Sequence, residues 1–219
     1  MSDVVFVQML DLVCGGLLLS GVLMLWRREL AAIVRLLIVQ GVLLAALAVL
    51  LGVREQSVEL YLVAAGVLVL KAVVLPGVLH RVLRDSGDAR EAEPLVNVTS
   101  SLLAAALLTL VAYAVSRPLV ALAPSATTRA LPVGLAVVFL GFFVLVTRRH
   151  ALSQVVGFLL LDNGIAATAF LATSGVPLVV ELGGSLDLLL LVLVLQVLAA
   201  RMRLTFGRTD MDELRELRD

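Results

Sequence analysis

Charged side chains are scarce in this sequence. Only 16% of its 219 residues are Asp, Glu, Lys or Arg, whereas 61% are hydrophobic and the mean hydropathy is +1.10. Soluble domains carry about 25% charged residues, so the composition excludes water as the main solvent of the chain. The formal net charge is zero. Because proteins that bind nucleic acid usually show a basic excess, we expect no nucleic-acid partner.

Cysteine and the common catalytic motifs are also nearly absent. The single cysteine, Cys14, lies inside an apolar run. One cysteine excludes a disulfide framework within the chain and a Cys-rich metal or iron-sulfur site, and we expect Cys14 to be a small buried hydrophobe. The sequence contains no glycine-rich phosphate loop, no G-x-S-x-G elbow and no H-E-x-x-H motif. We therefore predict no catalytic residue, bound metal or cofactor in this chain.

What the sequence does contain is a series of long apolar runs separated by short charged strings. Each run is about twenty residues long and continuously apolar, which is typical of transmembrane helices and not of alternating barrel strands. The predicted fold class is all-α, a polytopic membrane protein of about seven transmembrane helices. The lipid bilayer is therefore one of its expected partners. We expect these helices near residues 4–25, 30–52, 57–83, 95–115, 130–147, 151–174 and 178–204.

The arginines are distributed unevenly between the two ends of these helices. Only Arg54, Arg117 and Arg129 fall on the side of the N-terminus. The positive-inside rule therefore predicts a multi-pass protein of the inner (cell) membrane, with its N-terminus outside and its C-terminus in the cytoplasm. The other side has Arg35, about one turn into the second helix, and Arg27, Arg28, Arg81, Arg84, Arg90, Arg148, Arg149, Arg201, Arg203, Arg208, Arg215 and Arg218.

The first three and the last three helices share an outline that indicates a weak repeat. Each unit has an RR-containing turn, a helix with an amide at mid-span, and a third helix that follows a Glu. Four spans separate the units, so both would have the same orientation. The predicted organisation is a three-helix unit at 1–84, a connector with the fourth helix at 85–129, a second three-helix unit at 130–204 and a cytoplasmic amphipathic tail at 205–219.

Three ionisable side chains, Lys71, Asp162 and Asp187, are predicted to lie near the middle of the bilayer. A charge at that depth costs at least about 2.5 to 3.5 kcal/mol on insertion scales. Each of these side chains therefore needs an ionic partner, contact with water or a functional role that explains its presence. A proton relay is one interpretation. A buried ion pair between Lys71 and one of the acids, which only fixes the helix register, is the other. Further polar side chains are Glu181, near the outer interface, and the mid-span amides Gln40, Asn163 and Gln196, expected to hold bridging waters.

Three short patterns in these helices resemble a known family. They are Q-x-x-G-x-x-x-x-[ED]-N-G at Gln154 to Gly164, V-E-[IL]-G at Val180 to Gly183, with Asp187 after it, and K-x-x-x-x-P at Lys71 to Pro76. With the length and span count, they resemble hydrogenase-4 component E, a membrane subunit of energy-converting hydrogenases and formate hydrogenlyase. That family is in turn similar to the K subunit of respiratory complex I.

The resemblance implies a non-catalytic subunit of an oxidoreductase complex. Asp162 and Asp187 match the two intramembrane glutamates of the complex I subunit, although Asp162 replaces the usual Glu of the hydrogenase subunit. Lys71, Asp162, Glu181 and Asp187 would then line a proton or sodium path. Antiporter-like and complex I-like membrane subunits and a soluble redox arm would be partners, and these would carry the nickel-iron and iron-sulfur centres.

Three other functions stay open. A subunit of a multi-subunit cation/proton antiporter would need only the three-helix unit, so the chain length argues against it. A structural membrane anchor would use the polar residues for assembly. A stand-alone secondary transporter would require broken helices around a substrate site.

Overall fold

The computed structural model describes residues 2–86, 96–148 and 151–174, and they are almost entirely helical. The expected seventh helix at 178–204 and the tail at 205–219 lie outside the described residues, so the predicted repeat and domain boundaries stay predictions. The elements, in chain order, are α1 (Asp3–Trp26), α2 (Leu30–Glu55), α3 (Val58–Val67), the π-helix η1 (Leu68–Val74), α4 (Leu75–Ser86), α5 (Val98–Leu122), α6 (Ala126–Arg129), α7 (Leu131–Thr147) and α8 (Ala151–Thr173).

Six helical segments of the described chain are long and apolar enough to cross a membrane. In hydrocarbon a helix satisfies its backbone hydrogen bonds internally, which explains why each apolar run forms one uninterrupted rod. The expected helix at 57–83 is a rod made of α3, η1 and α4, and the expected helix at 130–147 is α7, preceded by the short α6. The prediction of an all-α polytopic membrane protein is confirmed to this extent.

The fourth helix is longer than the sequence predicts. We expected it to end near residue 115, before a connector, but α5 continues through Pro118 to Leu122. Its start is fixed by Asn97, whose side-chain oxygen accepts a hydrogen bond from the Ser100 amide at 2.8 Å. A proline removes only one helical hydrogen bond, whereas the apolar residues after it favour a helix in hydrocarbon. The expected loop therefore begins seven residues later than predicted, at residue 123 instead of 116.

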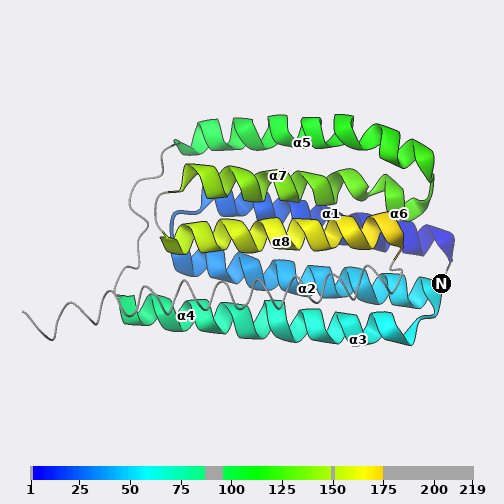
Figure 1. Cartoon of the computed structure of the whole chain (residues 1–219), viewed down its shortest axis with the longest axis horizontal. Coiled ribbons are helices and arrows are strands. Elements are labelled where there is room, and N and C mark those ends of the chain that lie inside the picture. The colour runs from blue at the N-terminus through cyan, green and yellow to red at the C-terminus, as the bar shows by residue number, and fades with distance from the viewer. Residues whose placement is uncertain (1, 87–95, 149–150, 175–219) are drawn as a thin grey trace, which may run out of the picture. The chain divides into compact units, whose positions relative to one another are not determined.

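The spans lie side by side, with α5 at one edge and the α3–α4 rod at the other (Figure 1). Between these edges, α2 contacts α1, α3, η1, α4 and α8. Of the six spans, α8 is the most buried and α5 the least. Large apolar side chains of α1, α2, α3 and α8 fill the half of the core that lies toward the bundle end with the N-terminus. They include Phe6, Leu10, Leu44, Leu51, Leu60, Phe170 and Leu171.

The closest helix contact joins α7 and α8 through glycines. A Cβ atom added at Gly141 would lie 2.4 Å from the amide nitrogen of Leu161, and one added at Gly164 would lie 2.4 Å from that of Val138. Because lipid tails are as apolar as leucine side chains, association of membrane helices depends on such close packing of small residues. These glycines therefore fix the position of α8, which carries Asp162.

Replacing Gly141 by Ala should destabilise the protein by about 1–3 kcal/mol, because the added methyl group meets backbone that cannot rotate away. The measurement is the free energy of unfolding of the purified full-length protein in detergent. Gly66→Ala is the matched control. A Cβ atom added at Gly66 would have nothing within 4 Å, so that change should be neutral or stabilising by up to about 1 kcal/mol. Equal stability of the two variants would contradict the packing described here.

Candidate functional site

An ion pair lies in the interior of the helical bundle. The Nζ atom of Lys71, in η1, lies 2.5 Å from the Oδ2 atom of Asp162, in α8. Only 3% of Lys71 and 6% of Asp162 is exposed. Asp162 is halfway along α8, about 16 Å from either end, so the contact falls near the middle of a bilayer. Lys71 is also the only lysine in the chain.

Two buried amides continue this polar network toward α1. Asn163, the residue after Asp162, donates from Nδ2 to Oε1 of Gln40 in α2 at 3.1 Å. Gln40 donates in turn from Nε2 to the carbonyl oxygen of Leu17 in α1 at 3.2 Å, and the Ser20 hydroxyl donates to the same oxygen at 2.9 Å. Because Asp162 and Asn163 are adjacent in α8, the ion pair and these hydrogen bonds together connect η1, α8, α2 and α1 side by side within the membrane plane.

Backbone geometry brings Lys71 to its position. It lies in the π-helical segment, where the Leu75 amide donates to the Leu70 carbonyl five residues earlier. The segment ends just before Pro76, which has no amide hydrogen and therefore cannot complete an α-helical pattern. On the facing helix, a Cβ atom at Gly41 would lie 2.8 Å from the carbonyl carbon of Lys71. Glycine at 41 therefore lets η1 approach α2, and π-helical turns of this kind are frequent at functional sites.

The electrostatics of the pair follow from its burial. Removing each ion from water costs several kcal/mol, and only a close, well-bonded partner offsets that cost. In a low dielectric the interaction between two charges is much stronger than in water, so the two side chains strongly resist separation. Such a pair can hold helices in register, and it can also exchange a proton when a neighbouring charge changes.

Comparison with known proteins identifies a family. The chain is 53% identical over 220 residues to the Mycobacterium tuberculosis protein named "Uncharacterized protein Rv0085", with both chains covered completely. The chain belongs to the Rv0085 family. It is also a distant homologue of hydrogenase-4 component E from Escherichia coli K12 and from Shigella flexneri, at 25% identity over 179 residues, which cover 82% of this chain and 83% of those proteins. The resemblance predicted from the sequence is thus confirmed.

No family model matches this member of the Rv0085 family, and no solved structure matches it. The roles of individual residues therefore depend on the geometry described above.

Of the seven site residues predicted for this Rv0085-family chain, the structure brings four together. Lys71 contacts Asp162, and Asn163 contacts Gln40 directly, although bridging waters were expected for the amides. The predicted relay residues Glu181 and Asp187 and the predicted supporting residue Gln196 lie outside the described residues. Sequence reasoning had left open which acid Lys71 would meet, and the structure places Asp162 there.

Two parts of the network were missed from the sequence. The carbonyl of Leu17 gives no signal because it belongs to the backbone, whereas Ser20 was visible as a hydroxyl within an apolar run. The π-helical turn was not predicted either. In the sequence, only Pro76, two residues after the π-helical segment, indicated an irregular turn there.

Replacing Lys71 by Met should destabilise the purified protein by about 3–5 kcal/mol, because it leaves a buried carboxylate without its cation. The double variant Lys71→Met/Asp162→Leu should recover most of that loss, since both charges are then replaced by apolar groups. Unfolding free energies of the wild type, the two single variants and the double variant give the coupling energy directly.

The control is Arg54→Met, which removes the cation of an exposed ion pair with Asp3 at the end of α1 and α2. Exposed pairs contribute little, so its stability should change little. Additive effects of the Lys71 and Asp162 substitutions would show that the two side chains do not interact in the folded protein.

Proposed function

We propose that this chain is a membrane subunit of a hydrogenase-4-like redox complex and that the Lys71–Asp162 pair lies on a proton path through that complex. The observation that carries the proposal is the buried pair itself, and the hydrogen bonds of Asn163 and Gln40 lie beside it between α8, α2 and α1. The distant homology to hydrogenase-4 component E supports the kind of complex. The chain would move charge within the assembly and would turn over no substrate alone.

In this proposal a proton moves when the charges around the pair change. Asp162 accepts a proton as the ammonium group of Lys71 is drawn toward another acceptor, and it releases the proton when Lys71 returns. Asn163 and Gln40 hold the carboxylate-bearing turn of α8 against α2 during these steps. Glu181 and Asp187, on the expected seventh helix, would continue the path.

The contact between Lys71 and Asp162 favours protons over sodium as the transported ion. A sodium ion would need several oxygen ligands, and here the nearby ammonium group already neutralises the carboxylate. A fixed cation next to the acid therefore disfavours a second cation and suits proton exchange.

The proposal also assigns partners and orientation. Antiporter-like and complex I-like membrane subunits would flank the chain, and a soluble redox arm would carry the nickel-iron and iron-sulfur centres. The end that holds Arg54, Arg117 and Arg129 would face outward, in keeping with the positive-inside rule.

A structural anchor is the competing function, because a buried ion pair can fix helix register without conducting anything. The two functions differ in what Asp162→Asn does. For a proton path, the complex should assemble and keep its electron-transfer activity but lose most of its coupled proton translocation. Asp162→Glu keeps a carboxylate at this position and should retain coupled proton translocation. For an anchor, assembly and activity should fall together, or neither should change.

The experiment uses a tagged full-length chain in its host. The complex is isolated from membranes to identify the co-purifying subunits, and hydrogen- or formate-driven acidification is measured in inverted vesicles. Asp3→Asn makes the same chemical change at an exposed acid and should leave both readouts unchanged. Full proton translocation with Asp162→Asn, in a correctly assembled complex, would refute the proposed path. Absence of redox subunits from the purified complex would refute the proposed assembly.

A further inference from the structure

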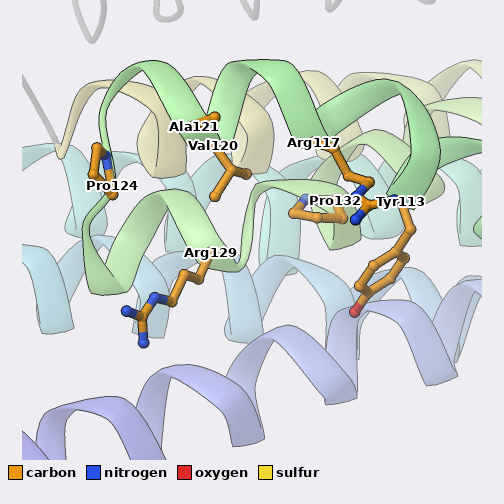
Figure 2. Close-up of a pocket in the computed structure, with 7 residues that line it drawn as sticks. All are labelled: Tyr113, Arg117, Val120, Ala121, Pro124, Arg129 and Pro132. Atoms are coloured by element: carbon orange, nitrogen blue, oxygen red, sulfur yellow. The ribbon is translucent and has the colours of Figure 1, made fainter.

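A pocket of about 380 Å³ lies where α5 ends and α7 begins, at the same end of the bundle as the N-terminus. Its lining side chains come from α5, from the loop and short helix α6 after it, and from the first turn of α7 (Figure 2). It is well separated along the helices from the mid-span ion pair and contains none of its residues. The pocket thus needs a separate explanation.

The polar part of the pocket is cationic. Arg117 and Arg129 both line it, together with Tyr113, which lies one helical turn before Arg117 on the same face of α5. Within residues 2–86, 96–148 and 151–174, neither arginine has a carboxylate partner. Arg54, at the same end of the bundle, differs because it pairs with Asp3 and stacks on the Phe6 ring.

Arg117 and Tyr113 present a guanidinium group and a phenol hydroxyl from the same face of α5, a donor pair that suits a phosphate group, and Arg129 adds positive charge at the other side of the pocket (Figure 2). Arginine binds phosphate oxygens through two parallel hydrogen bonds, and these charge-assisted bonds are stronger than neutral ones. Among the described residues, no carboxylate lines the pocket to compete for the guanidinium groups.

The remaining walls of the pocket are apolar. Val120, Ala121, Pro124 and Pro132 supply them. Arg117 lies five residues before the end of α5 and therefore about 7.5 Å inside the span, at the depth where a side chain reaches the headgroup region. Beside the pocket, α5 exposes an apolar surface toward its other end, which includes Leu103, Leu107 and Leu110. A ligand that fits both parts has an anionic head and a hydrocarbon tail.

We propose that this pocket binds an anionic phospholipid, with the headgroup phosphate held by Arg117 and Tyr113, the positive charge of Arg129 attracting the headgroup from the other side of the pocket, and an acyl chain lying along the exposed surface of α5. The apolar walls favour a lipid over free phosphate, since a soluble anion would gain nothing from them. The depth of Arg117 and the low burial of α5 favour a lipid over a protein segment.

The test is native mass spectrometry of the purified full-length protein in detergent. It is titrated with dioleoyl-phosphatidylglycerol, with dioleoyl-phosphatidylcholine, or with inorganic phosphate as a competitor. The wild type should bind the anionic lipid about tenfold more tightly than the zwitterionic one. Arg117→Gln and Arg129→Gln should each weaken that binding about tenfold, and millimolar phosphate should not displace the lipid. Arg54→Gln removes one positive charge from the same end and should bind lipid like the wild type.

Each other outcome overturns the proposal. Equal binding of both lipids, or an equal loss in Arg54→Gln and Arg117→Gln, would show a general charge effect and no defined site. Displacement by inorganic phosphate would indicate a site for a soluble anion. Circular dichroism of each variant confirms that it is folded, and the two single substitutions, Arg117→Gln and Arg129→Gln, keep the test valid if one of them cannot be purified.

Discussion

The structure depends on one contact, the ion pair between Lys71 and Asp162 inside the hydrocarbon layer. Either charge alone at that depth costs several kcal/mol, so the fold in which the rod that carries Lys71 faces the helix that carries Asp162 in one register is strongly favoured. Gly41 allows the close approach that the contact needs, and the π-helical turn brings the lysine into the bundle. The same constraint that fixes the helices also creates the only pair of opposite charges buried at mid-span among the described residues.

Around this contact, packing of small residues replaces the hydrophobic effect as the means of holding helices together. The glycines of α7 and α8 let their backbones touch, and the amides of Gln40 and Asn163 join α8 to α2. The result is a support on which a carboxylate is held in a defined place, as the proposed proton path requires. By contrast, α5 is loosely covered and carries Arg117 near its end, close to Arg129 of α6 in sequence and in the same pocket, which suits a surface that meets lipid.

The sequence predicted the spans well because apolar length is a direct physical requirement of the bilayer. It also placed Lys71, Asp162, Gln40 and Asn163 well inside their helical segments, since that position follows from counting residues along a helix. It did not predict which acid meets Lys71, because the partner is 91 positions away and depends on how helices rotate and pack. The extension of α5 past Pro118 was also missed, because one proline costs a single hydrogen bond and apolar neighbours outweigh it. Arg117 and Arg129 were considered only as charges that set orientation, and their shared pocket required the fold.

The chain's single lysine allows the central contact to be measured directly in lipid bilayers. Protein labelled with ¹⁵N at the lysine Nζ and with ¹³C at the aspartate carboxyl carbons has only one labelled ammonium group, so a solid-state NMR dipolar-dephasing experiment reports which carboxylate lies next to it. We predict strong dephasing of the Lys71 signal in the wild type, at hydrogen-bonding range, and its loss in Asp162→Asn. A wild-type signal that is not dephased, or dephasing unchanged in Asp162→Asn, would contradict the account.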